Sequence, residues 1–87
     1  MNELFLTYVE AGMLNASKSL INEGMANVNA TNQDGKTALM YAASASRVEC
    51  VKILLSLGAN TQLHNEDGFS AIELTSNRDV FRQLRSA

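Results

Sequence analysis

Apolar residues in the middle of the chain recur at helical spacing. Val51, Leu54 and Leu55 lie at positions i, i+3 and i+4, which places them on one face of a helix. Gly58 follows shortly afterwards, and glycine readily takes the left-handed backbone conformation that ends many helices. The pattern predicts a helix with one apolar face that ends at Gly58.

Polar residues mark the start of this helix and of a shorter one before it. Ser46 and Glu49 have the spacing of a capping box, in which each side chain bonds the other residue's backbone N–H group. Thr37 is a good N-cap residue, and it precedes an alanine-rich run that ends at about Ser44. We therefore predict two short helices in succession, one starting after Thr37 and one after Ser46.

The same arrangement recurs along the chain. Gly24 is matched by Gly58 and Gly35 by Gly68, which gives a period of about 33–34 residues. The segments that align at this period are 34–39 with 67–72, and 20–24 with 54–58. A second capping-box pair, at 70–73, starts the next unit. Self-similarity of this kind predicts stacked repeats, each with two short antiparallel helices and about ten polar, turn-forming residues.

The central unit resembles the ankyrin repeat. Residues 32–43 read N-Q-D-G-K-T-A-L-M-Y-A-A, against a family pattern of D-x-x-G-x-T-P-L-H-x-A-A. Residues 54–60 read L-L-S-L-G-A-N and match the end of the family's second helix. Ala38 stands where proline is usual, and Met40 stands where histidine is usual. Because proline is pre-organised for a first helical turn, these departures are expected to weaken the start of that helix.

The resemblance implies an all-α solenoid of about two and a half ankyrin repeats with short β-hairpin finger loops. We expect a single domain, 1–87, with a degenerate N-terminal repeat at 1–30, a full repeat at 31–63 and a shortened C-terminal capping repeat at 64–87. Relative to the full repeat, about four residues are missing between Thr75 and Val80.

In the last unit, the apolar residues of the final helix are expected to pack inward and its arginines to stay in water. The apolar set is Val80, Phe81 and Leu84, and the arginines are Arg78, Arg82 and Arg85. Polar outer faces on terminal repeats stop further stacking. With one full repeat and two modified ends, the chain is expected to have a stability near the lower end of the usual range of about 5–15 kcal/mol.

Composition and charge exclude several classes of protein. Of the 87 residues, 46% are hydrophobic and 18% are charged, which is typical of a chain that folds. A net charge of −2 argues against a dedicated binder of nucleic acid or membrane surfaces. No apolar stretch is long enough for a transmembrane helix, and the N-terminus lacks the pattern of a secretory signal. A cytoplasmic location is therefore expected.

Few residues are candidates for catalysis or metal binding. Cys50 is the only cysteine and His64 the only histidine, which excludes a disulfide framework and a cysteine-rich zinc site. His64 lies in a polar loop, where a solvated side chain is the ordinary explanation. Cys50 lies on the apolar helix, where it is expected to be a buried small hydrophobe. The glycines never cluster as in a phosphate-binding loop. The sequence predicts no enzyme, no cofactor and no metal site.

The ankyrin resemblance implies that the chain binds another protein, of unknown identity, as an adaptor or inhibitor. The positions carried over from the family are Gln33, Asp34, Lys36, Glu66, Asp67 and Phe69 in the fingers, and Ser44, Ala45, Asn77 and Arg78 on the inner helices, with Tyr41 nearby. Phe69 is the most informative, because an aromatic residue beside a tight Asp-Gly turn is either tucked against the neighbouring unit or exposed as a binding anchor. The acidic balance favours a partner with a basic patch.

A self-associating structural module is the alternative function. Residues 3–10 are apolar on more than one face of their expected helix, so the ends of a short solenoid could stack on a second copy. This alternative predicts a stable dimer at micromolar concentration, whereas recognition of another protein predicts a monomer or a weak homodimer. Sedimentation separates the two.

Overall fold

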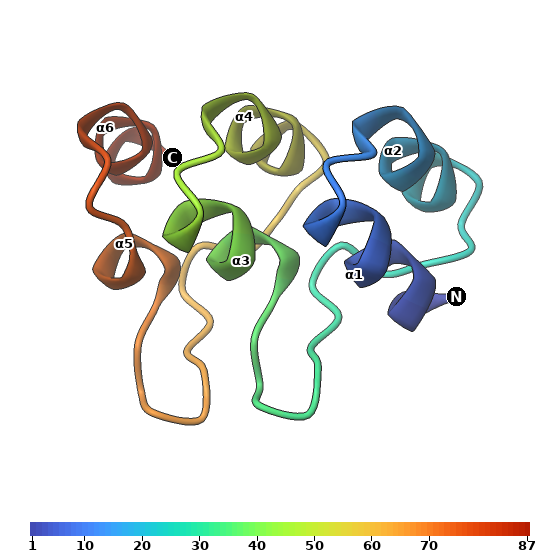
Figure 1. The fold of residues 1–87 in the computed structure, drawn as a ribbon, viewed down its shortest axis with the longest axis horizontal. Helices are drawn as coiled ribbons and strands as arrows, with labels where there is room; N and C mark the ends of the chain where they lie inside the picture. The colour runs from blue at the N-terminus through green and yellow to red at the C-terminus, as the bar shows by residue number, and fades with distance from the viewer.

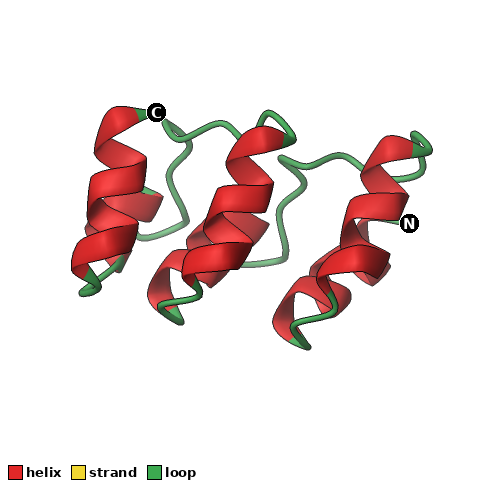
Figure 2. Cartoon of the chain, turned by 90° about the horizontal axis from the view of Figure 1, so that it is seen from above, coloured by secondary structure: helices red, strands yellow, loops and turns green.

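Six helices in two rows make up the computed structural model, which describes residues 1–87 (Figure 1). Their bounds are α1 Asn2–Glu10, α2 Leu14–Asn22, α3 Ala38–Ser44, α4 Val48–Ser56, α5 Ala71–Leu74 and α6 Arg78–Ser86. The odd-numbered helices form an inner row next to two long loops, and the even-numbered helices form an outer row (Figure 1). Seen from above, the three helix pairs stack side by side (Figure 2). The predicted all-α solenoid is confirmed.

The core runs through all three helix pairs. Phe5 and Val9 of α1, Leu39 of α3, Leu54 of α4 and Val80 of α6 are each at most 1% exposed and belong to one apolar cluster. Contacts join α1 to α3 and α3 to α5 in the inner row, and α2 to α4 and α4 to α6 in the outer row. Each pair therefore buries its apolar face against its neighbour, as stacked repeats require.

The start of α3 is formed as the sequence predicts. Thr37 is the N-cap, and its hydroxyl accepts a hydrogen bond from the Met40 N–H at 3.2 Å. In return, the Met40 sulfur accepts from the Thr37 N–H at 3.4 Å, and the Met40 side chain is buried. The thioether therefore fills the acceptor position at the start of the helix. Sulfur is a weak acceptor, so this half of the cap is weaker than a nitrogen or oxygen acceptor would make it.

The predicted capping box at Ser46 and Glu49 is wrong. The N-cap of α4 is Arg47, and no side chain caps this helix. Ser46 instead has a left-handed backbone, with φ of 58°, and ends the preceding helix. The Arg47 N–H donates to the Ala42 carbonyl and the Ser46 N–H donates to the Ala43 carbonyl, which is the bonding of a Schellman motif. Serine therefore occupies a C′ position, where glycine is favoured.

Ser46→Gly is expected to raise the free energy of unfolding by about 0.5–1 kcal/mol, because a left-handed backbone is strained for serine and unstrained for glycine. Gly12, the equivalent residue one repeat earlier, already takes this conformation after α1, with φ of 76°. Urea denaturation followed by circular dichroism measures the change. Ser44→Gly is the matched control: Ser44 lies in α3 itself, where glycine lowers stability by about 0.5–1 kcal/mol. A loss of stability in both variants would contradict the assignment.

The predicted start of α5 at Ser70 is confirmed. The Glu73 carboxylate accepts hydrogen bonds from the Ser70 N–H at 2.9 Å and from the Ser70 hydroxyl at 3.0 Å. These bonds favour the ionised carboxylate, and they lower the pKa of Glu73 below its ordinary value of 4.5. The acidic side chain thus fixes the first turn of a helix that is only four residues long.

Glu73→Gln is expected to flatten the dependence of stability on acid pH. Because the pKa of Glu73 is lower in the folded chain than in the unfolded chain, the unfolded chain binds its proton more tightly. The stabilisation is therefore complete above the ordinary carboxyl pKa and is lost as the pH falls through the folded value. Urea midpoints measured between about pH 6 and pH 3 test this, and Glu23→Gln controls for the loss of one negative charge. An unchanged slope in Glu73→Gln would refute the linkage.

The shortening of the last unit lies in α5. This helix has four residues where α3 has seven, so three residues are lost rather than about four. The outer helix is not shortened, because α6 keeps the same nine-residue length as α4. The loss therefore falls on the inner helix of the last pair.

The expectation for the last helix is only partly correct. Val80 and Leu84 are buried, and all three arginines are exposed. Phe81, however, is 43% exposed, so its expected inward packing is wrong. Its counterpart at the fourth position of α4 is the buried Val51. Val51 lies on a helix with neighbours on both sides, because α4 packs against α2 and α6, whereas α6 is the last helix of the outer row (Figure 1).

Asparagine side chains hold the loops that follow the first two helix pairs. The Asn2 side-chain oxygen accepts from the Asn27 N–H at 2.8 Å, and the Asn29 side-chain oxygen accepts from the Asn60 N–H at 2.7 Å. The second bond joins the loop after the first helix pair to the loop after the second. These bonds hold the connections that lead into the fingers at a fixed spacing.

Candidate functional site

Two finger loops project beyond the inner row of helices (Figure 1). In the first finger, residues 31–37, Thr31 and Thr37 form an antiparallel bridge. The Asn32 side-chain oxygen accepts from the backbone N–H groups of Asp34 and Lys36, each at 2.9 Å. Such Asx bonding fixes a turn without long strands. The Asn32 side chain therefore fixes the backbone of the finger tip.

The second finger, residues 64–70, repeats this arrangement. The Asn65 side-chain oxygen accepts from the N–H groups of Asp67 at 3.0 Å and Phe69 at 2.9 Å. The Asn65 N–H donates in turn to the Phe69 carbonyl at 2.9 Å. Asn32 and Asn65 thus present the residues that follow them in the same way.

The two tips are bonded to each other. The Glu66 N–H donates to the Asp34 carbonyl at 2.9 Å. Gly35 lies so close to the second finger that a Cβ atom there would be 3.2 Å from the Glu66 nitrogen. Asp34 and Glu66, both predicted site residues, are therefore brought together by backbone contact, and their exposed side chains form one acidic edge.

The first finger is also linked to the inner helix behind it. The Lys36 Nζ lies 4.9 Å from the centroid of the Tyr41 ring, a cation–π contact. Tyr41 is half-buried on α3, and its carbonyl accepts from the Ser44 hydroxyl at 3.0 Å. Ala45, the C-cap of α3, is exposed. The structure thus brings together four predicted residues from a finger and a helix.

Phe69 is exposed rather than tucked into the core. Its side chain is 46% exposed, and it stands in the second finger at the position that Lys36 has in the first. The residue equivalent to Tyr41 in the last unit is Leu74, which packs against the core from α5. In the central unit, Lys36 contacts the Tyr41 ring. In the last unit, Phe69 stands at the position of Lys36 and Leu74 at the position of Tyr41.

Two predicted site residues lie elsewhere. Asn77 is the N-cap of the outer helix α6, and its side-chain oxygen accepts from the N–H groups of Asp79 and Val80 at 2.9 and 3.1 Å. Arg78 is the first residue of the same helix. Their expected position on the inner helix is wrong, because the shortened α5 ends at Leu74.

A groove of about 530 Å³ lies between α1 and the first finger. It is lined by Asn2, Glu3, Leu6, Thr7, Glu10, Thr31, Asn32, Gln33 and Asp34. The α1 residues were not predicted from the sequence. The repeat register could have found two of them, because Thr7 and Glu10 occupy the positions of Tyr41 and Ser44 one repeat earlier.

The finger side of the molecule is acidic. Five of the nine acidic residues of the chain lie in the groove or at the finger tips: Glu3, Glu10, Asp34, Glu66 and Asp67. All five are exposed, and Lys36 is the one cation of the fingers. A negative surface of this kind attracts a basic partner and speeds association.

Residues that invite a catalytic interpretation are placed as expected. Cys50 is buried, and this burial raises the pKa of its thiol, which keeps it in the unreactive form. His64 is exposed in the second finger. No group of three or more histidine, cysteine, aspartate or glutamate side chains is arranged to hold a metal ion. No helix has the length and apolar character needed to cross a membrane.

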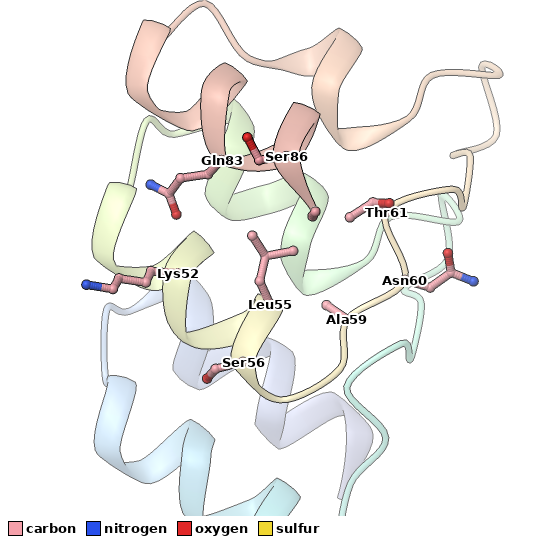
Figure 3. A pocket seen from close by; sticks show the side chains of 9 residues that line it. Lys52, Leu55, Ser56, Ala59, Asn60, Thr61, Gln83 and Ser86 are labelled. Atoms are coloured by element: carbon pink, nitrogen blue, oxygen red, sulfur yellow. The ribbon is translucent and has the colours of Figure 1, made fainter.

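A second hollow, of about 650 Å³, lies between the outer helices α4 and α6 (Figure 3). Leu55 points into it, while the ammonium group of Lys52 extends away from it (Figure 3). The remaining lining is mostly small and polar, from Ser56, Thr61 and Ser86 among others. The hollow therefore gathers no reactive groups.

The family follows from comparison with known proteins. A sequence model for ankyrin repeats in three copies matches residues 5–86. The chain belongs to the ankyrin repeat family. This match confirms the resemblance read from residues 32–43. Ankyrin repeats generally mediate protein–protein interaction and are typically non-catalytic.

Individual ankyrin repeat proteins resemble this chain over part of their length. The ankyrin repeat, SAM and basic leucine zipper domain-containing protein 1 of Carollia perspicillata is 35% identical over 83 residues, which cover 95% of this chain and 17% of that protein. A putative ankyrin repeat protein of Rickettsia bellii is 41% identical over 63 residues, covering 69% of this chain and 38% of that protein. The crystal structure of the ankyrin repeat domain of Bcl-3 has a TM-score of 0.88 at 30% identity, covering 93% of this chain and 35% of that one. This ankyrin chain thus spans less than half the length of each of these three compared chains.

Proposed function

We propose that this ankyrin repeat chain is an adaptor or inhibitor that docks on another protein through its fingers and inner helices. The observation that carries the proposal is the half-exposed Phe69 on a finger whose backbone is fixed by Asn65. An apolar anchor surrounded by polar residues is the usual composition of an interface hot spot. A pre-ordered loop binds with little loss of conformational entropy.

The partner proposed for this surface is a protein with a basic patch. The acidic groove beside α1 adjoins the finger tips, since Gln33 and Asp34 line it. Cationic side chains of a partner would meet Glu3, Glu10 and Asp34 there, while an apolar residue contacts Phe69. Binding of this kind weakens as ionic strength rises.

Affinity capture with matched triple variants tests this proposal. The finger variant is Gln33→Ala, Lys36→Ala, Phe69→Ala. The control is Gln62→Ala, Lys52→Ala, Met25→Ala, which removes a glutamine, a lysine and an exposed apolar side chain elsewhere. A protein captured by the wild type and by the control, but not by the folded finger variant, would identify the partner. Equal capture by all three would remove support for the fingers as the site.

Self-association through the repeat ends is the second candidate function. Exposed apolar residues favour it: Met1 is 64% and Leu4 is 37% exposed at the first helix, and Phe81 is 43% exposed at the last. Sedimentation of the isolated chain separates the candidates. A stable dimer at micromolar concentration supports stacking of two copies, whereas a monomer supports recognition of another protein.

A further inference from the structure

The far side of α6 corresponds in register to a face that α4 uses for packing. The two helices have equal length, so they align from their first residues, Val48 and Arg78. This alignment places buried Cys50 over buried Val80, and buried Leu54 over buried Leu84. The repeat geometry therefore identifies which residues of α6 would meet a further helix.

Those residues differ sharply in chemistry between the two helices. On α4 they are Val48, Val51 and Leu55, and on α6 their counterparts are Arg78, Phe81 and Arg85. Lys52 of α4 has Arg82 as its counterpart. Two of the three apolar positions have thus become arginines, the third is a phenylalanine, and the one basic position stays basic. We call Arg78, Phe81, Arg82 and Arg85 the α6 face.

The α6 face is exposed and is carried by a well-anchored helix. All three arginines are exposed, and Phe81 is 43% exposed. On the opposite side, Val80 and Leu84 are buried in the core. The Gln83 side chain donates to the Val48 carbonyl of α4 at 3.5 Å. The basic side chains therefore project from a fixed backbone.

This concentration of charge stands out against the rest of the chain. Three of its seven basic residues lie on the α6 face, although the net charge is −2. Asp79 is the only acidic residue of α6. Solubility alone would be served by charges of either sign, and it does not require a half-exposed aromatic ring among three guanidinium groups.

We propose that the α6 face binds an acidic amphipathic helix of a partner protein, stacked against α6 as α6 itself stacks against α4. Carboxylates on the partner helix pair with the guanidinium groups, which suit bidentate bonding to carboxylate. An apolar residue between them covers Phe81. The surface is separate from the fingers, so this proposal does not rest on the one made for them.

Nucleic acid is the less favoured ligand for these arginines. The chain is acidic overall, and five of its carboxylates line the finger side. These carboxylates would repel the phosphates of a nucleic acid that extends beyond the α6 face. A partner helix of limited length contacts α6 alone and avoids that repulsion.

Selection from a displayed library of helical peptides of about 14 residues tests the proposal. Peptides are selected on the full wild-type chain and then measured on two variants. Phe81→Ser, Arg82→Glu alters the α6 face, and Met25→Ser, Lys52→Glu makes the same changes in type at exposed positions elsewhere. We expect peptides with aspartate or glutamate flanking leucine or phenylalanine. They should bind the control as they bind the wild type, and bind the α6 variant at least about thirtyfold more weakly.

Several outcomes would overturn the proposal. One is that no selected peptide distinguishes the α6 variant from the control, with both variants folded by circular dichroism. Another is that the distinguishing peptides are not enriched in acidic residues. Binding of a single-stranded oligonucleotide of about 20 nucleotides to the wild type but not to the α6 variant would reassign the face to nucleic acid. A homodimer lost in Phe81→Ser, Arg82→Glu would reassign it to a second copy.

Discussion

Phe5→Ala is expected to lower the free energy of unfolding by about 3–5 kcal/mol. Phe5 is fully buried on α1 and belongs to the cluster that continues into α3 and α6. Truncating a buried phenylalanine removes apolar contact and leaves a cavity that the surroundings only partly fill. The chain is expected to have a stability near the lower end of about 5–15 kcal/mol, so this loss approaches the whole of it.

Leu4→Ala is the matched control for this result. Leu4 is the neighbouring residue on the same helix and is 37% exposed, so its truncation is expected to change stability by less than about 1 kcal/mol. Urea denaturation followed by circular dichroism gives both values, provided that the transition is two-state. If Phe5→Ala and Leu4→Ala had equally small effects, the degenerate first unit would not belong to the cooperative core.

The register of the repeats could be predicted from the sequence because it depends on local signals. Thr37 and Ser70 each cap a helix by bonding the residue three positions further along the chain. Their equivalence follows from the alignment of Gly35 with Gly68. Such signals act between residues that are near in sequence, so they can be recognised from one amino-acid sequence alone. The all-α stack and the starts of α3 and α5 follow from them.

The sequence-based predictions that are wrong concern residues whose structure depends on neighbours distant in the chain, or whose local signals fit more than one role. Serine suits an N-cap, and nothing in the residues around Ser46 marks it as left-handed; its equivalence to Gly12 does. Phe81 has helical spacing from Leu84, but it is half-exposed on the last helix of the stack. Counting from the central repeat places Asn77 on an inner helix, because the sequence does not show that α5 ends early, at Leu74.

The candidate site also contains residues that the sequence predicts and residues that only the packing of repeats brings together. The finger residues could be assigned by counting, because the Asp-Gly turns fix their positions. The repeat register marks Thr7 and Glu10 of the groove beside α1, but not the groove as a whole. Glu3 and Thr31 belong to different repeats and meet only when the first unit packs on the second. The bond from the Glu66 N–H to the Asp34 carbonyl likewise joins two repeats.

Phe69→Ala is expected to weaken partner binding by at least about 2 kcal/mol, roughly thirtyfold in Kd. The 46% exposure of Phe69 leaves a large part of the ring available to a partner. Its backbone is held by the Asn65 side chain, so little order is lost when the ring is removed. Folding stability is therefore expected to change by no more than about 0.5 kcal/mol.

The two quantities must be measured on the same variant, because they separate the possible roles of the ring. Binding to the protein captured by the wild type gives the change in Kd, and urea denaturation gives the change in stability. Met25→Ala is the matched control, since Met25 is an apolar side chain of similar exposure, 51%, outside both the fingers and α6. A large loss of stability in Phe69→Ala would make the ring part of the core. Unchanged binding in a stable variant would leave the fingers without their anchor, and the acidic groove beside α1 would then have to account for recognition.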